Sequence, residues 1–376
     1  MKIQIWHNIL WSRYKGAVFT ELNKKALERK HELHFIQICE TDVSRKKLSE
    51  VDLTFHKYPY NLIFKGSYHD IPLFKRVFVL FFEVFKSDAD LIALPGYHSI
   101  EFIGLLVAAL ITRKKIGLFC DSTIYDRPQS FLKGLIKRLF FYFCDFFMCY
   151  GIRSRDYLIH YGVKPENIFF RCQAAALPTE YDSNQAKLSR LKLAANIDQP
   201  RFLYVGRLSK EKDISLLLRA FSNSKKALPL SKLILIGDGN LKADLKKEVE
   251  RLSIVDDVEF LGSKSGNDLY SEFSKATCLV LPSSSEPWGL VVNESLAYGC
   301  PVIVSSNCGC VPELVENHNH GLIFMAGNLQ DLQMKLEQAP AKFINKNKIA
   351  DCAIDVISQF TPARAAEEIL LACLSK

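Results

Sequence analysis

The chain has 376 residues, of which 48% are hydrophobic and 24% are charged, and this composition excludes an intrinsically disordered protein. A length above about 300 residues favours two domains over one. The charge is unevenly distributed along the chain, with 26 Lys and Arg against 17 Asp and Glu before Leu177, and 23 against 24 after it. The excess of positive charge in the first half suggests an anionic partner. The alternative is that these cations only keep the surface soluble.

The first 177 residues alternate short apolar runs with longer amphipathic segments, a pattern typical of a parallel sheet flanked by helices. The N-terminus, MKIQIWHNILWSRYKG, is not expected to be a signal peptide, because polar residues interrupt its apolar run. The expected strands of this half are residues 3–6, 33–38, 91–94, 115–119 and 146–150.

Residues 178–200 are polar, lack a strand-like run and carry a proline at each end, which predicts an interdomain linker with a short helix. A second alternating series follows, with strands expected at 201–205, 232–236, 258–261, 278–281 and 301–304. The fold class is therefore α/β, with two tandem Rossmann-like doubly wound domains. Since such sheets bind ligands at the carboxyl ends of their strands, we expect the site in a cleft between the domains.

The expected boundaries follow from these runs. Residues 1–177 form an N-terminal domain, and 201–358 form a C-terminal domain. The last segment, 359–376, is expected to hold a helix that packs back towards the N-terminal domain.

The densest chemical signal is SSSEPWGLVVNESLAYGCPVIVS, at residues 283–305. Glu286 falls in a loop, and Glu294 lies about one turn inside a helix that follows it. The backbone N–H groups of Gly289 and Leu290, at the helix N-terminus, suit a phosphate, and each carboxylate suits the hydroxyl groups of a sugar. The alternative is an ordinary helix start with favourable acidic residues.

This stretch resembles the glutamate, seven residues, glutamate motif of the GT-B glycosyltransferases of retaining family 4, also described as glycosyl transferases group 1. The resemblance implies that Glu286 faces the donor sugar and that Glu294 binds the ribose. The segment FLYVGRLSKEKDISLLLRAF, at 202–221, looks like the part of that family that presents an arginine and a lysine, here Arg207 and Lys212, to the donor diphosphate. Such cations would stabilise the charge that the leaving group gains, although a solvated surface role is the alternative for either of them.

Two further donor-side positions follow from the resemblance. LILIGDGN looks like the family's next strand, and Gly237 would let the chain turn tightly after it, although a GxG is also consistent with a plain turn. In the family the following strand end, here near Ser263, approaches the nucleotide base. In the first half, WSRYKGAVF replaces paired glycines in the loop after the first strand, and Gly16 is the candidate for a close approach to phosphate or acceptor.

The acceptor-side candidates come from the N-terminal half. Where retaining relatives often carry a histidine, GLFCDST has Asp121, which is the candidate general base or acceptor-binding residue, with a helix or turn cap as the alternative. His98 is the second acceptor candidate. No metal ion is expected. Asp88 and Asp90 form a DxD sequence, but they come before a strand, whereas parallel sheets bind ligands at the carboxyl ends of their strands. These two residues fit a solvated turn.

Two segments, 64–86 and 127–150, interleave Lys and Arg with many phenylalanines. Helices of this kind lie in an anionic membrane interface or simply pack on a sheet, and both interpretations stay open. No nucleic-acid partner is expected, because neither half offers a recognition module.

The resemblance implies a retaining, metal-independent hexosyltransferase with a UDP- or GDP-sugar donor. The expected acceptor is a saccharide linked to a polyprenyl diphosphate, in the synthesis of a surface polysaccharide such as a capsule or O-antigen. The 11 cysteines show no CxxC pair, so we expect a cytoplasmic protein, soluble or peripheral on the inner face of the plasma membrane. A nucleotide-sugar epimerase of the same architecture and a non-catalytic scaffold subunit remain the alternatives.

Overall fold

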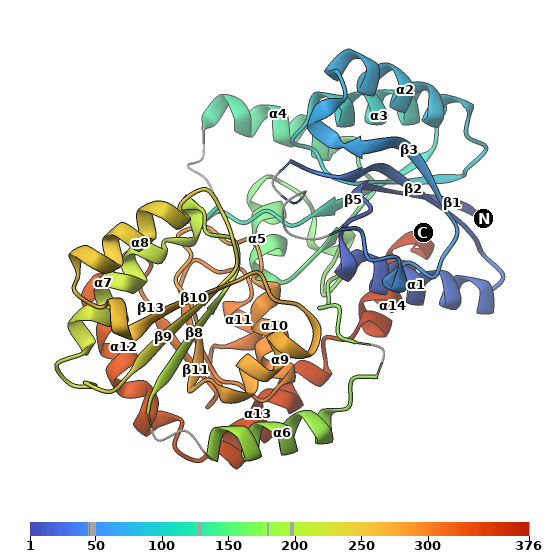
Figure 1. The fold of residues 1–376 in the computed structure, drawn as a ribbon. Coiled ribbons are helices and arrows are strands. Elements are labelled where there is room, and N and C mark those ends of the chain that lie inside the picture. Colours follow the sequence, from blue (N-terminus) through green and yellow to red (C-terminus); the bar gives the residue numbers. More distant parts are fainter. Residues whose placement is uncertain (44, 46–49, 127–129, 179, 196–198, 376) are drawn as a thin grey trace. The chain divides into compact units, whose positions relative to one another are not determined.

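The computed structural model describes residues 1–43, 45, 50–126, 130–178, 180–195 and 199–375. The chain divides into two compact units: unit 1 comprises Met1–Ile124, Pro128–Ala176 and Thr361–Lys376, and unit 2 comprises Tyr125–Arg127 and Leu177–Phe360. Each unit is built on one parallel sheet with helices against it (Figure 1). The predicted α/β fold class with two Rossmann-like units is confirmed.

The sheet of unit 1 has seven parallel strands in the order β3-β2-β1-β4-β5-β6-β7. The strands are β1 (Lys2–Ile9), β2 (Glu32–Thr41), β3 (Tyr60–Ser67), β4 (Leu91–Leu94), β5 (Lys115–Cys120), β6 (Phe146–Cys149) and β7 (Ile168–Phe169). All five strands expected in this half are present, whereas β3 and β7 were not predicted. The strand order reverses between β1 and β4, which is where sheets of this type bind ligands.

Helices cover both faces of this sheet. On one face lie α1 (Arg13–Glu28) and α14 (Pro362–Leu374). On the other lie α2 (Leu73–Lys86), α3 (Ile100–Ile111), α4 (Phe131–Tyr142) and α5 (Ile152–His160).

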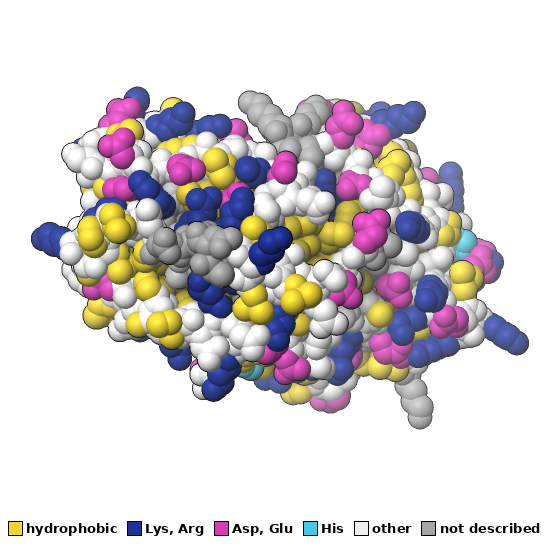
Figure 2. Space-filling model, turned by 60° about the horizontal axis from the view of Figure 1, so that its bottom comes forward, with side chains coloured by type: hydrophobic (Ala, Val, Ile, Leu, Met, Phe, Trp, Pro, Cys, Tyr) yellow, Lys and Arg dark blue, Asp and Glu magenta, His cyan; other side chains and the backbone are white. Residues whose placement is uncertain are grey.

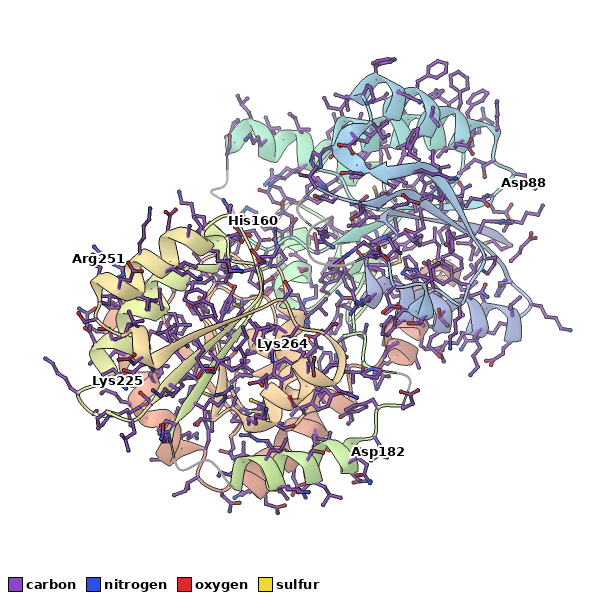
Figure 3. The ribbon with its side chains drawn as sticks, viewed as in Figure 1. Asp88, His160, Asp182, Lys225, Arg251 and Lys264 are labelled. Carbon is purple, nitrogen blue, oxygen red and sulfur yellow. The ribbon has the colours of Figure 1, made fainter. Side chains whose placement is uncertain are left out.

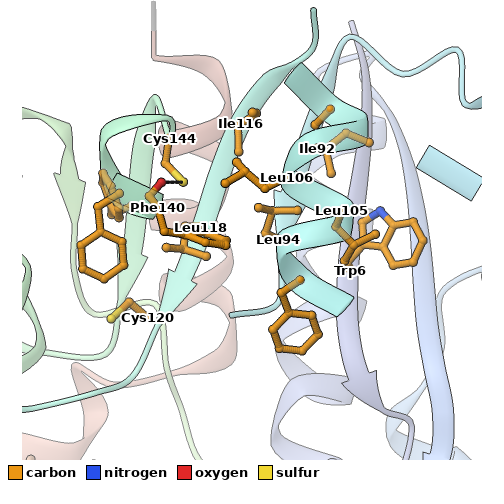
Figure 4. Packing of buried hydrophobic residues seen from close by; sticks show 14 of the residues in the cluster. Trp6, Ile92, Leu94, Leu105, Leu106, Ile116, Leu118, Cys120, Phe140 and Cys144 are labelled. Carbon is orange, nitrogen blue, oxygen red and sulfur yellow. Dashed lines mark hydrogen bonds between the residues drawn. The ribbon is translucent and has the colours of Figure 1, made fainter. Parts of the chain in front are cut away.

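Successive side chains of a strand point to opposite faces, so the core of unit 1 has two parts. On β4 and β5, Ile92, Leu94 and Leu118 lie under α2, α3 and α4, where Figure 4 shows their packing. Ala93 and Phe119 lie under α1 and α14. Every residue of β4 and β6 is buried, which explains why these strands read as unbroken apolar runs.

The C-terminal helix α14 belongs to unit 1 although it follows unit 2 in sequence. It packs on α1, and Glu367 forms ion pairs with Lys25 at 3.1 Å and Arg29 at 2.5 Å. The helix itself was predicted from its composition, and its observed bounds begin at the expected proline.

The sheet of unit 2 has six parallel strands in the order β10-β9-β8-β11-β12-β13. The strands are β8 (Arg201–Val205), β9 (Lys232–Ile236), β10 (Val258–Gly262), β11 (Cys278–Leu281), β12 (Val302–Ser305) and β13 (Gly321–Phe324). The first five match the expected runs, and β13 was not predicted. Here the order reverses between β8 and β11.

The helices of unit 2 form two groups. The first group is α7 (Ile214–Ser224), α8 (Lys242–Arg251) and α12 (Leu329–Lys342). The second is α6 (Ser183–Ala195), α9 (Gly266–Lys275), α10 (Leu290–Ala297) and α13 (Lys346–Ser358), with the short α11 (Val311–Leu314) elsewhere in the unit. The segment expected as a linker, residues 178–200, contains α6. The buried Arg190 of this helix donates hydrogen bonds to the carbonyl groups of Phe273 and Ser274 at the end of α9.

All eleven cysteines are free thiols, and ten of them are buried. In the part of the chain that the structure describes, no helix combines the length and the apolar character needed to cross a bilayer.

Candidate functional site

The donor-side residues of unit 2 lie at the carboxyl edge of its sheet. Arg207 follows β8, Gly237 follows β9, Ser263 follows β10 and Glu286 follows β11. Because these four strands are parallel neighbours, the loops after them meet at one edge. The structure therefore brings together the positions that the sequence motifs suggested for this unit.

Lys212 and Glu286 form an ion pair at this edge. Lys212 ends the short 3₁₀ helix η4 (Lys210–Lys212) and donates a hydrogen bond to the Glu286 carboxylate. Both side chains are only 14% exposed, so solvent screens their attraction less than that of a surface pair. The Ser283 hydroxyl also faces this carboxylate, at 3.5 Å.

Arg207 has its own carboxylate partner. Its Nη2 donates to Glu211 Oε1 at 3.1 Å, and the Ser209 hydroxyl donates to the same oxygen at 2.7 Å. Burial acts to raise the pKa of Glu211, but the hydrogen bonds from Ser209 and its own backbone, with the charges of Arg207 and Lys212, leave that pKa below its ordinary value. Glu211 was not predicted from the sequence, although its place four residues after Arg207 was a usable signal.

Helix α10 begins at the same edge. Gly289 is its N-cap, with a φ of +101° that disfavours any side chain, and a Cβ there would lie 3.5 Å from the Glu286 side chain. From Leu290 onwards the first N–H groups of the helix have no partner within it, and the dipole adds positive potential. Glu294 lies one turn further on, partly exposed. The site thus combines two cations, three carboxylates and a helix N-terminus.

Gly237 allows two loops of this edge to pass each other. Its φ is +136°, and a Cβ would lie 1.9 Å from the carbonyl oxygen of Gly206. A Cβ on Gly239 would similarly lie 2.3 Å from the carbonyl oxygen of Leu208. The GDG sequence therefore marks a close approach of the loops after β8 and β9.

The candidates of unit 1 follow neighbouring strands as well, because His98 lies after β4 and Asp121 directly after β5. Both are exposed. The backbone carbonyl of Asp121 accepts a hydrogen bond from the Ser154 hydroxyl at 3.2 Å, and the His98 ring meets that of Phe102 edge-on at 5.2 Å.

The expected position of Gly16 in a loop is wrong. Helix α1 already begins at Arg13, so Gly16 lies in its first turns and is buried. A Cβ at this position would come within 2.9 Å of the His56 ring, and this packing accounts for the glycine.

Helix α1 also carries a buried lysine. Lys15 is 4% exposed, and its Nζ has no hydrogen-bond partner among the described residues. The Nζ lies 4.6 Å from the ring centre of Phe119 and 5.1 Å from that of Tyr150, which offers cation–π contacts in place of solvent. Burial lowers the pKa of Lys15 to about 8, while Cys172 and Asp121 act in the opposite direction.

Asp88 and Asp90 lie before β4, at the edge opposite the carboxyl ends. Asp88 pairs with the Lys2 side chain, and Asp90 accepts a hydrogen bond from the Lys2 backbone at 2.8 Å. Figure 3 shows Asp88 at the periphery of unit 1. Among the described residues, no group of three or more His, Cys, Asp or Glu side chains is arranged to hold a metal ion.

Known proteins with similar sequences are glycosyltransferases. Residues 186–349 match the family described as Glycosyl transferases group 1. An alpha-monoglucosyldiacylglycerol synthase of Streptococcus pneumoniae is 32% identical over 191 residues, which cover 48% of this chain and 41% of that protein. The N-acetylgalactosamine-N,N'-diacetylbacillosaminyl-diphospho-undecaprenol 4-alpha-N-acetylgalactosaminyltransferase of Campylobacter jejuni is 32% identical over 150 residues, covering 39% and 40%. The matches thus span less than half the length of these relatives.

A likeness to solved structures extends over the whole chain. The structure of Anabaena HepE in complex with UDP has a TM-score of 0.73 and 18% sequence identity, and 99% of each chain is covered. At this identity the likeness concerns the fold, and it confirms the expected GT-B architecture.

Proposed function

Because residues 186–349 match the family described as Glycosyl transferases group 1, we propose that this chain transfers a hexosyl unit from a nucleotide diphosphate sugar to a hydroxyl of a saccharide. The observation that carries this proposal is the gathering of Arg207, Lys212 and Glu286 beside the N-terminus of α10. Cations and free N–H groups suit a diphosphate, and carboxylates suit sugar hydroxyls.

On this proposal, donor binding exchanges the partners of the two cations. The diphosphate binds to Arg207, Lys212 and the N-terminus of α10, and it competes with the carboxylates of Glu211 and Glu286 that hold these cations now. Once Lys212 turns to the diphosphate, the Glu286 carboxylate is free to accept hydrogen bonds from the donor sugar. Glu294 takes the ribose hydroxyls.

The proposed reaction retains the configuration of the sugar and needs no metal ion. The bond between the anomeric carbon and the diphosphate breaks, a bond to the acceptor oxygen forms on the same face, and the departing phosphate oxygen takes the acceptor's proton. Arg207 and Lys212 stabilise the negative charge that grows on the diphosphate, which lowers the barrier because that charge is largest in the transition state. Asp121 and His98 of unit 1 are the proposed acceptor-side groups.

The proposed acceptor is a lipid-linked saccharide in surface polysaccharide synthesis. One relative supports this class, because its name specifies a saccharide linked to diphospho-undecaprenol as the acceptor. The name of a second relative specifies a glucosyldiacylglycerol product, which supports a lipid acceptor more generally. The UDP in the Anabaena HepE structure makes a UDP-sugar the first donor to test, with a GDP-sugar next.

The test is a measurement of released nucleotide. The purified chain is incubated with UDP-glucose, UDP-galactose or GDP-mannose in the presence of EDTA, with and without a bacterial lipid extract. We expect release from one donor that rises with the extract and is lost in Glu286→Gln but not in the exposed control Glu316→Gln.

Three results would contradict the proposal. Isomerisation of the donor without release would indicate an epimerase. Nucleotide binding without turnover of any donor would indicate a scaffold subunit. Release that requires an added metal ion would contradict the metal-independent mechanism.

A further inference from the structure

The helices α2, α3 and α4 of unit 1 are apolar on both of their sides. Their inner sides bury Leu80, Phe102 and Phe140 against the sheet. Their outer sides carry further large apolar side chains, each between 59% and 81% exposed: Phe74 and Phe78 on α2, Ile100 on α3, and Phe131, Leu132 and Tyr142 on α4. We call this outer surface the apolar face.

The apolar face is continuous between α2 and α3. A groove of about 740 Å³ runs along α2 beside the start of α3, lined by seven apolar side chains and Lys75. The rings of Phe78 and Phe82 lie 4.6 Å apart at its side, and Figure 3 shows rings that project outward from α2. Monomeric proteins rarely leave an apolar surface of this extent open to water, because each exposed ring forgoes the free energy of burial.

The exposed charges on these helices are mostly positive. Lys75, Lys86, Lys133 and Arg138 are exposed, and Glu83 is the one exposed acid within the three helices, all of whose residues are described. The other acid of these helices, Glu101, is 2% exposed and lies 3.4 Å from Arg76. The face shown in Figure 2 carries both signs of charge side by side.

We propose that the apolar face docks on an anionic lipid bilayer, with its aromatic and aliphatic side chains among the lipids and its cations against the headgroups. Aromatic residues flanked by lysine and arginine have the composition of interfacial helices, and long cationic side chains reach the headgroups while their stems stay in apolar surroundings. A second copy of the chain fits less well, because a symmetric contact would set the same cationic face against itself.

The proposal concerns this surface alone and is independent of the donor chemistry. Its test is flotation of the full chain with vesicles of phosphatidylcholine alone or with added phosphatidylglycerol, without any nucleotide sugar. We expect flotation with the anionic vesicles that weakens as salt is raised.

Variants then assign the binding to the apolar face. We expect Phe74→Ser/Phe78→Ser and Lys133→Gln/Arg138→Gln each to lower the partition onto anionic vesicles about tenfold. The matched control is Leu27→Ser/Leu371→Ser, which removes exposed leucines from α1 and α14 on the opposite layer of unit 1 and should leave partition unchanged. We expect all variants to unfold at the same temperature as the wild type, because the replaced side chains are exposed. Equal unfolding temperatures would exclude misfolding as the cause of weaker vesicle binding.

Three outcomes would overturn the proposal. The first is no flotation with anionic vesicles, and the second is an equal loss in the control variant. The third is a dimeric wild-type chain in solution that Phe74→Ser/Phe78→Ser converts to monomers, which would assign the apolar face to a second copy.

Discussion

Lys212 donates a hydrogen bond to the carboxylate of Glu286, and both side chains are largely buried at the carboxyl edge of the unit 2 sheet. If the diphosphate of the donor takes Lys212 from this partner, the lysine contributes to binding and to the stabilisation of the leaving group. We expect Lys212→Met to lower the rate of nucleotide release roughly a hundredfold to a thousandfold, the range for one preorganised donor of this kind.

The neighbouring Lys210 provides the control for this prediction, because it belongs to the same short helix and is exposed. Calorimetric titration should show that Lys212→Met weakens binding of UDP more than that of uridine, whereas Lys210→Met affects neither. An equal loss for both ligands would mean that Lys212 supports the loop and does not bind the diphosphate.

Gly237 and Gly327 both have a positive φ, but they differ in what surrounds them. A Cβ on Gly237 would lie 1.9 Å from the Gly206 carbonyl oxygen, whereas one on Gly327 would meet nothing within 4 Å. Gly327→Ala should therefore cost only the conformational term of about 1–2 kcal/mol. Gly237→Ala should cost clearly more and should also weaken nucleotide binding. Urea unfolding of both variants measures the difference, and equal losses would contradict the close approach of the two loops.

Apart from β10, the strands that were found from sequence are mostly buried. The runs of β8, β9 and β11 are short, continuous and apolar, so their bounds were predicted to the residue. The edge strand β3 was not predicted because the polar, exposed Asn61 and Lys65 break its apolar run. The strand β13 has four residues, most of them only partly buried, and offers too short a signal.

Local sequence could not supply the tertiary pairings at the site. The motifs located Lys212 and Glu286, but the pairing of these two residues depends on where the loops after β8 and β11 fold. The two interpretations of the phenylalanine-rich segments could not be separated either, because a helix that packs on a sheet and one that docks on lipid both need apolar residues. The structure shows α2 with apolar side chains on both sides.

Three histidines, the buried His56 and His320 and the partly buried His7, should make folding sensitive to acid. Burial lowers the pKa of His7 to about 3 and the pKa values of His56 and His320 to about 4. The unfolded chain binds protons at these groups near pH 6.5 and the folded chain does not, so the free energy of unfolding should fall as the pH drops from 6.5 towards 4. Each histidine adds a slope of up to about 1.4 kcal/mol per pH unit.

The His320→Gln variant tests this origin of the pH dependence. We expect its free energy of unfolding to fall less steeply between pH 6.5 and 4 than that of the wild type. Parallel curves for His320→Gln and the wild type would show that acid acts elsewhere.

Lys15 is a buried cation whose Nζ has no hydrogen-bond partner among the described residues, so its charge costs free energy on folding that the rings of Phe119 and Tyr150 offset only in part. We expect Lys15→Met, which keeps a long apolar side chain, to raise the free energy of unfolding at pH 7 by roughly 1–3 kcal/mol. The exposed Lys24→Met on the same helix should change it little.

The pH dependence of the free energy of unfolding tests whether the charge of Lys15 is the cause. The folded chain releases the Lys15 proton near a pKa of about 8 and the unfolded chain only near 10.5, so stability attributable to this group rises with pH between these values. Lys15→Met should remove that rise, so its advantage over the wild type should shrink above pH 8. A variant that is less stable than the wild type at every pH would show instead that the ammonium group stabilises the fold. If Lys15→Met is more stable but has lost nucleotide release, the lysine has been kept at the edge of the unit 1 sheet for function, at a cost in stability.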